Sequence, residues 1–364
     1  MKLQKINTFV LLYFSLNVLH IITHEKCKIN IKGDVAMKFL VGYQMRETPS
    51  FVEEIVRQRE HIREVYFSWG NYANGRNSQL QQSGLTPWEA QAQQERDLKI
   101  ISESGIPLNV LFNAMCYGKH SQSRAFFEGV GQTVDYLQTR YGLASVTTTS
   151  LLIAKFLKSN FAKLDIRASV NMGIGTVEGL DYVKDYFDSF YAARELNRDF
   201  GALARLKEWC ETNGKTLYGL ANSGCLNHCS AHVFHDNLVA HEAEISEMDN
   251  GYAFEGVCGQ YLKNPENHRA LLDNTSYVRP EDISLYDGVF EAMKIATRVN
   301  ANPERVLRAY IEGKHLGSVL DLLEPNHTGL LYPYLLENSN IVSEMRDDKL
   351  CYTGLEKALI HLEG

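Results

Sequence analysis

The sequence predicts an α/β protein whose main domain is a (β/α)8 barrel of the TIM type, irregular in places, with a helical appendage at its C-terminus. Short apolar runs that read as buried strands alternate with helical patterns along the chain. Eight such runs are present, and eight strands alternating with helices are typical of this barrel. The predicted strands are 38–43, 64–69, 107–113, 144–149, 166–171, 187–192, 215–221 and 275–278.

Helical patterns separate these runs. The clearest helix start lies at residues 86–89, where Thr86 suits the N-cap, Pro87 the first helical position and Glu89 the partner position of a capping box. Gly105 ends this helix. The other predicted helices are 50–61, 121–139, 150–161, 176–186, 198–212, 226–243, 288–298 and 302–312.

A doubly wound open sheet is the alternative fold. The nucleotide-binding members of that class carry a glycine-rich loop after the first strand, but the run Gln44-Met45-Arg46-Glu47 stands there instead. The run Met172-Gly173-Ile174-Gly175 resembles half of a dinucleotide-binding loop, and we interpret it as a turn at a barrel rim. The barrel is therefore the preferred prediction.

Composition excludes some classes of function. The chain has 364 residues with 45% hydrophobic and 22% charged residues, as expected of a globular protein. A net charge of −7 argues against a broad nucleic-acid-binding face. Seven cysteines, an odd number at irregular spacings, favour a reduced cytoplasmic protein over a disulfide framework.

The N-terminus imitates a signal peptide, because Lys2 and Lys5 precede an apolar run over 9–22. The run is short for a membrane-spanning helix, and no small-residue cleavage pattern follows it. We therefore expect residues 1–36 to be an extension, residues 37–314 to form the barrel and residues 315–364 to form the appendage. If 1–36 is a true signal or anchor, the protein is instead secreted or membrane-anchored.

Polar side chains follow most of the predicted strands. In a TIM barrel these positions share one rim, where active sites lie. Arg279 is suited to bidentate pairing with a carboxylate or phosphate, and Glu195 to general acid or base chemistry, so both are candidate catalytic residues. The candidate substrate-binding residues are Asn113, Asn171, Asn197, Asn222 and His235.

Cys225 and Cys229 form the strongest chemical signal. They lie four residues apart in the run 222–229, and a helix here would place them on one face with His232. Thiolates are soft ligands that select zinc or iron–sulfur clusters. A pair of buried cysteines and a redox dithiol are the alternative interpretations.

Two further cysteines extend this set. Cys116 follows the third predicted strand and Cys258 precedes the eighth, so both can reach the same end of the barrel. Four cysteinates suit a [4Fe–4S] cluster or a structural zinc ion, and zinc knuckles of two-residue spacing are missing. We therefore predict a cluster held by Cys116, Cys225, Cys229 and Cys258. Cys210 is a reserve ligand, and His232 or His235 can replace one thiolate.

Three segments resemble the collagenase-like peptidase family, U32. They are the cysteine run 220–229, residues 195–199 at the start of the preceding helix, and residues 277–282 with 294–298 near the end of the barrel. The resemblance covers about residues 38–325. It implies a barrel-type fold. The family contains proteins named as peptidases and others that act in oxygen-independent hydroxylation of ubiquinone precursors or RNA.

The resemblance also bears on cofactor and partners. Several of the hydroxylation proteins hold a [4Fe–4S] cluster with four cysteines, and members of the family pair with one another, which implies a homo- or hetero-oligomer. The Tyr-Ser-Gly-x-Cys segment of the peptidase-named members is absent from this chain. The family's ligand positions therefore cannot be copied onto this sequence.

Three functions follow. The first is an iron–sulfur enzyme of the hydroxylation or redox type acting on a small molecule or RNA. The second is a peptidase, for which Cys225 with His228 or His235 is conceivable, although His241-Glu242 lacks the second histidine of a metallopeptidase helix. The third is a non-enzymatic, metal-stabilised scaffold or partner subunit.

Overall fold

Eight parallel strands pair in chain order and close into a barrel, which confirms the predicted fold class. The computed structural model describes residues 36–46, 50–75, 85–249 and 254–362, and the predicted extension 1–36 lies outside them except for its last residue. The strands are β1 (Phe39–Gly42), β2 (Ile62–Phe67), β3 (Leu108–Phe112), β4 (Ser145–Thr148), β5 (Asp165–Ala168), β6 (Ser189–Tyr191), β7 (Thr216–Leu220) and β8 (Met293–Ile295).

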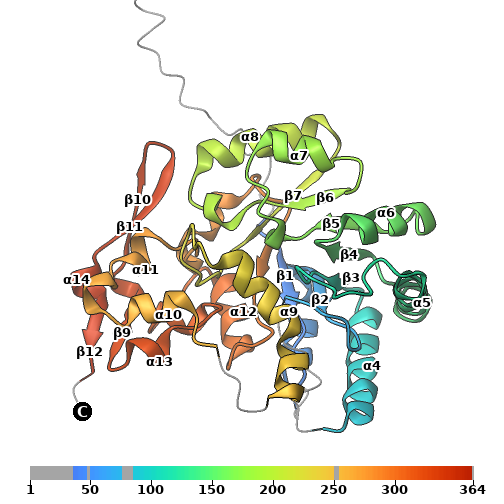
Figure 1. Cartoon of the computed structure of the whole chain (residues 1–364). Helices are drawn as coiled ribbons and strands as arrows, with labels where there is room; N and C mark the ends of the chain where they lie inside the picture. The colour runs from blue at the N-terminus through green and yellow to red at the C-terminus, as the bar shows by residue number, and fades with distance from the viewer. Residues whose placement is uncertain (1–35, 47–49, 76–84, 250–253, 363–364) are drawn as a thin grey trace, which may run out of the picture. The chain divides into compact units, whose positions relative to one another are not determined.

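Helices surround this barrel (Figure 1). Those that follow a strand directly are α2 (Ser50–Arg57), α4 (Pro87–Glu103), α5 (Arg124–Tyr141), α6 (Leu151–Asn160), α7 (Val177–Val183), α8 (Phe200–Thr212) and α12 (Pro303–Glu312). Helix α4 begins with the predicted capping box, in which the Thr86 side chain accepts from the Glu89 backbone N–H and the Glu89 carboxylate accepts from the Thr86 N–H. None of the described helices is long and apolar enough to cross a membrane.

The eighth predicted strand was wrong. Residues 275–278 are buried but irregular, and β8 lies at Met293–Ile295, inside a segment predicted to be helical. Barrel closure fixes its position, because Phe39 in β1 pairs with Met293 and Gly219 in β7 pairs with the same residue. Both candidate segments are short and apolar, so periodicity cannot separate a strand from a helix there.

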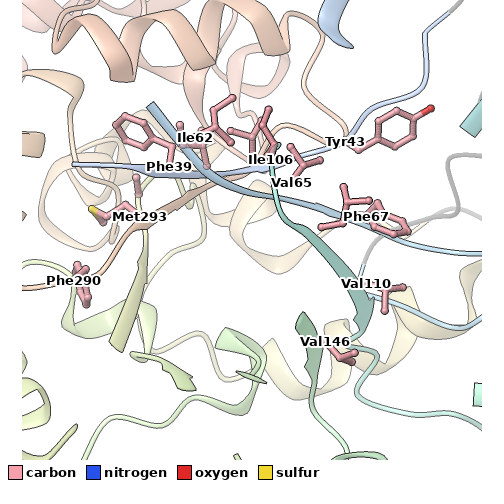
Figure 2. Close-up of a cluster of buried hydrophobic side chains, with 14 of the residues drawn as sticks. Phe39, Tyr43, Ile62, Val65, Phe67, Ile106, Val110, Val146, Phe290 and Met293 are labelled. Atoms are coloured by element: carbon pink, nitrogen blue, oxygen red, sulfur yellow. The ribbon is translucent and has the colours of Figure 1, made fainter. Parts of the chain in front are cut away.

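The hydrophobic core lies between the strands and the helices. Alternate strand residues point outward, so Phe39, Val65, Phe67 and Val110 pack together in one cluster with Met293 (Figure 2). The intervening residues face the barrel interior.

That interior holds a buried ion pair rather than a purely apolar filling. Arg167 on β5 is 2% exposed and donates to both carboxylate oxygens of Glu64 on β2, at 2.8 and 3.2 Å. Its remaining donors reach Asp165 at 2.6 Å and Ser189 at 3.0 Å, and its guanidinium lies 3.9 Å from the centre of the Tyr218 ring. The charge is thus paired, hydrogen-bonded and stacked, as a buried arginine requires.

A long connection joins β7 to β8. It contains α9 (His232–Met248), α10 (Val257–Leu262) and α11 (Ala270–Asp273). Leu262 and Leu271 from this connection share a second hydrophobic cluster with Leu320 and Leu336, which follow the barrel. The connection and the C-terminal segment therefore pack as one layer.

The C-terminal appendage is less helical than predicted. After α13 (Thr328–Leu331), strand β9 (Tyr334–Leu336) pairs with β12 (Leu359–His361), and β10 (Val342–Arg346) pairs with β11 (Lys349–Thr353). Among the described residues after α13, the single α-helix is the four-residue α14 (Leu355–Ala358). The hairpin of β10 and β11 turns through two residues with positive φ, Asp347 and Asp348, which a helical pattern does not reveal.

We predict that Glu64→Ala destabilises the protein by roughly 3–5 kcal/mol, because it leaves the buried Arg167 charge uncompensated. The matched control is Arg63→Ala, one residue away, whose exposed ion pair with Glu291 at 3.4 Å contributes less than about 1 kcal/mol. Urea unfolding monitored by circular dichroism measures both. Equal loss in the two variants would contradict a structural role for the interior pair.

Candidate functional site

A cavity of about 270 Å³ lies where the chain leaves strands β6, β7 and β8, at the carboxyl ends of the barrel strands. Its walls come from the start of the segment after β6, from the long β7–β8 connection and from the beginning of the appendage. The lining residues are Arg194, Glu195, Cys225, Leu226, Cys229, His232, His235, Asp236, Val239, Glu242, Cys258, Val299, Glu324 and Pro325.

Three of the four predicted cysteine ligands meet in this cavity. Cys225 and Cys229 come from the turn after β7, and Cys258 from the first turn of α10, 29 residues after Cys229. Burial raises the pKa of the Cys258 thiol, and the nearby Cys225 and Cys229 sulfurs raise it further.

Cys116 does not line the cavity. It lies in the loop after β3, where its sulfur accepts from the Gly118 backbone N–H at 3.4 Å. Among the described residues, no group of three or more Cys, His, Asp or Glu side chains is close enough to bind a single metal ion. The three thiols thus share a cavity without converging on one point.

The predicted helical face of Cys225, Cys229 and His232 is absent. Residues 225–231 are irregular, with His228 in the left-handed region at φ 58°, and α9 begins only at His232. The backbone of this segment pairs elsewhere, because Leu226 forms a bridge with Thr275 and the Asn227 N–H donates to the Asn274 carbonyl at 2.6 Å. The two cysteines are brought together by a turn rather than by helical spacing.

Arg194 is the functional residue that the sequence prediction missed. It is 7% exposed and donates to the Cys225 sulfur at 3.4 Å and to Asn171 at 3.4 Å. Its Nη2 atom also lies 2.9 Å from His232 Nε2. The sequence position could have indicated this residue, because Arg194 lies three residues after β6 and residues that follow barrel strands lie at the active-site rim.

His232 faces two partners with one ring nitrogen. Its Nε2 atom lies 2.9 Å from Arg194 and 3.0 Å from the Asp236 carboxylate. A guanidinium only donates and a carboxylate only accepts, so the two contacts require different tautomers of a neutral imidazole. The proton on His232 therefore decides whether the ring bonds to Arg194 or to Asp236.

Two predicted asparagines support this arginine. Asn171 accepts from Arg194, and its own amide donates to the Asn113 backbone carbonyl at 3.4 Å. Asn113 in turn accepts from the Gly75 N–H at 3.1 Å. The chain of contacts joins the exits of β2, β3, β5 and β6 into one polar rim.

The other predicted residues divide into two groups. Glu195 and His235 line the cavity. Asn197 and Asn222 are buried and bond to backbone carbonyls, including Ser276 at 3.0 Å from Asn197 and Ala296 at 2.8 Å from Asn222, so both hold the barrel exits together.

Arg279 lies away from the cavity. Its guanidinium donates to Asn338 at 2.9 Å, to the Ile341 carbonyl at 2.9 Å and to Ser343 at 3.0 Å. These contacts fix the appendage to the barrel. The catalytic assignment depended on a strand ending just before this residue, and that strand is not formed.

Helix α9 runs from the exit of β6 to the loop after β3 and is labelled in Figure 1. Its first residue, His232, contacts Arg194 beyond β6, and His241 approaches Gly118 beyond β3, on the opposite side of the strand order. The face containing His235, Val239 and Glu242 lines the cavity. The helix therefore covers the site.

His327 secures the turn that holds the thiols. It is 2% exposed and lies 2.8 Å, through Nε2, from the Gly224 carbonyl, to which a neutral ring donates. Burial lowers the pKa of His327. In the unfolded chain the ring protonates near its ordinary pKa of about 6.5, so the unfolded state binds more protons as the pH falls below that value.

We therefore predict that stability decreases from pH 7.5 to pH 5.5, and that His327→Gln, which keeps an N–H donor for Gly224, reduces this decrease. Urea midpoints at the two pH values measure it. Burial also lowers the pKa of His315, so a smaller pH dependence persists in the variant. An unchanged pH dependence in His327→Gln would show that this ring is not responsible.

Comparison with known proteins agrees with this architecture. No protein-family model matches the chain. A protein of Methanocaldococcus jannaschii named an uncharacterized protease is 22% identical over 239 residues, which are 63% of this chain and 67% of that protein. A solved structure of a U32 peptidase has a TM-score of 0.50 at 14% identity and covers 72% of this chain and 93% of its own. The solved structure agrees with the resemblance at the level of the fold.

Proposed function

We propose that this protein is a U32-type barrel enzyme that holds an iron–sulfur cluster at its active-site rim and catalyses a hydroxylation or redox reaction. The observation that carries the proposal is the meeting of Cys225, Cys229 and Cys258 in one cavity at the carboxyl ends of the strands. Cysteines from separate segments are the ligands that iron–sulfur clusters use, and this rim is where active sites of such barrels lie, which supports the proposal.

The donor geometry favours a cluster over a single zinc ion. Tetrahedral Zn–S bonds of about 2.3 Å require sulfurs about 3.8 Å apart around one point. The described thiols share a cavity but do not form such a group. A cubane binds each cysteine through a different iron, so its ligands need not converge on one point.

His235 is our choice for the fourth protein ligand. It lines the same cavity, and both its ring and the Cys258 sulfur lie within 4 Å of the position where a side chain on Gly256 would begin. Cys116, the ligand predicted from the sequence, would have to enter from the loop after β3. Removing each residue separately distinguishes the two.

The residues of the chain have distinct parts in this proposal. When bound, a cluster supplies one-electron chemistry. Arg194 donates to the Cys225 sulfur, the kind of hydrogen bond that tunes a cysteinate ligand, and Asn171 orients the guanidinium. Glu195 lines the cavity beside them and can take or give a proton.

The test is anaerobic purification followed by iron, sulfide and zinc analysis and a visible absorption spectrum. We expect about four irons and four sulfides per chain. Alanine at Cys225, Cys229 or Cys258 should each remove most of the iron, because each variant deletes a ligand.

Cys351→Ala is the matched control, since Cys351 lies on β11 outside the cavity, and it should retain full iron content. If His235→Ala loses iron and Cys116→Ala does not, the fourth ligand is the histidine. Stoichiometric zinc without iron or sulfide in the native protein would overturn the cluster proposal.

A peptidase is the second candidate, and the names of the similar proteins favour it. Within the described residues, the Cys225 sulfur bonds to Arg194 and no imidazole lies within hydrogen-bond distance of it. A cysteine peptidase would therefore need a histidine of α9 to move.

Fluorogenic peptides test this second candidate. Cleavage by the native chain that Cys225→Ser abolishes and Cys351→Ser leaves intact would support a cysteine peptidase. Cleavage that survives Cys225→Ser would assign the activity elsewhere.

A further inference from the structure

A second cavity, of about 420 Å³, borders the cysteine turn. Asn227 and His228 of this turn line the second cavity, whereas Cys225 and Cys229 line the first. The other walls of the second cavity come from the segment after β6, from α11 and from β11. None of the three thiols of the first cavity lines the second, so its chemistry is a separate question.

Arg198 is fixed in the wall of this second cavity. Its two Nη atoms donate to the backbone carbonyls of Leu272, at 2.8 Å, and Thr275. Its guanidinium lies 4.8 Å from the centre of the Tyr352 ring, within the range of a cation–π contact. Its own carbonyl accepts from the Leu350 N–H at 2.9 Å. An arginine held in this way loses little side-chain freedom when it binds a further group.

The charge of Arg198 has no counter-ion among the described residues. Two of its five N–H groups reach neutral carbonyl oxygens, and the other three bond to no described residue. The Asp273 carboxylate in the same wall already pairs with Arg269 at 2.8 Å. The Asp199 carboxylate pairs with Lys349 at 3.6 Å. The guanidinium of Arg198 is therefore open to an anion from solution.

Apolar side chains stand beside this charge. Leu196, Leu272 and Leu350 line the second cavity, and the third carboxylate of its wall, that of Glu195, borders the first cavity as well. A volume of about 420 Å³ admits a small molecule. A ligand that matches the wall thus carries an anionic group on a short apolar body.

We propose that the second cavity binds a small molecule through a carboxylate or phosphate group, which pairs with the Arg198 guanidinium. The parallel N–H groups of a guanidinium match two oxygen atoms of either anion. Lys349 on β11, whose side chain is 61% exposed, supplies a second positive charge. The inference goes beyond the proposed function and does not rest on it, because no proposed cluster ligand lines this cavity.

Four probes with the same six-carbon chain test the preference for an anion. Hexanoate carries a carboxylate, hexyl phosphate a phosphate, hexylammonium a positive charge and 1-hexanol no charge at pH 7. We expect the full-length native chain to bind one of the two anions at least about tenfold more tightly than 1-hexanol, as measured by titration calorimetry. Hexylammonium should bind no more tightly than 1-hexanol. The anion that binds more tightly distinguishes a carboxylate ligand from a phosphate ligand.

Variants locate the anion. Arg198→Gln should weaken binding of that anion at least about fivefold and leave 1-hexanol unchanged, because the variant removes the guanidinium. Arg205→Gln is the matched control, since Arg205 is exposed on α8 and lines neither cavity, and its affinities should equal those of the native chain.

Lys349→Gln keeps the test decisive if Arg198→Gln does not fold. The Lys349 side chain is largely exposed and does not tether the loop that Arg198 holds, so this variant should fold. We expect it to weaken anion binding at least about twofold, and circular dichroism checks the fold of each variant.

Other results overturn the proposal. These are equal affinity for the anions and 1-hexanol, tighter binding of hexylammonium, no binding of any probe, or anion binding that survives both Arg198→Gln and Lys349→Gln. Anion binding that is lost in Arg194→Gln and kept in Arg198→Gln would place the anion in the first cavity instead.

Discussion

The buried pair of Glu64 and Arg167 is the constraint on which the rest of the structure depends. A charge buried inside a barrel is stable only if it is paired and hydrogen-bonded. Here its hydrogen-bond partners lie on successive strands, so those strands must keep one register. Asn109 on β3 donates to Ser145 on β4, and Ser145 donates to Glu64 on β2, while Arg167 on β5 reaches Ser189 on β6. A slip of β2 or β5 would separate Glu64 from Arg167 and leave both charges unpaired. The interior network thus specifies the strand register, and the register sets where each strand exit lies.

The sequence predicted the strands that are continuous runs of buried apolar residues. It did not predict features that depend on contacts between residues far apart in the chain. Seven strands were found because each is a run of apolar residues bounded by turn signals. The eighth was misplaced because pairing with β1, not local pattern, selects Met293–Ile295 over the equally buried segment 275–278. The meeting of Cys225 and Cys229 with Cys258 followed from chain position at the rim. Arg194 was missed although it follows β6 at the same rim, and its contacts with Cys225 and His232 depend on side-chain packing that the sequence does not show.

Most of the cavity wall comes from one connection, between β7 and β8, rather than from all eight loops that follow the strands. The turn after β7, the crossing helix α9 and the start of α10 supply most of the cavity wall, and all lie between β7 and β8. The exits of β6 and β8 add Arg194, Glu195 and Val299 to the wall, whereas those of β3 and β5 act indirectly. Asn113 and Asn171 touch neither thiols nor carboxylates in the cavity, yet they hold the one arginine that bonds to Cys225. Arg279 and Asn222 serve the same end by fixing the appendage that forms the far wall.

The pairing of β1 with β8 has a consequence for the order of assembly. Phe39 meets Met293 across 254 residues, so the barrel joins its first and last strands only after nearly the whole domain has been synthesised. All three cavity thiols leave the ribosome before β8 does. The three cavity cysteines thus exist for a time on an open, incomplete barrel. In the closed barrel they are partly buried, so strand closure reduces the exposure of these thiols to oxidation.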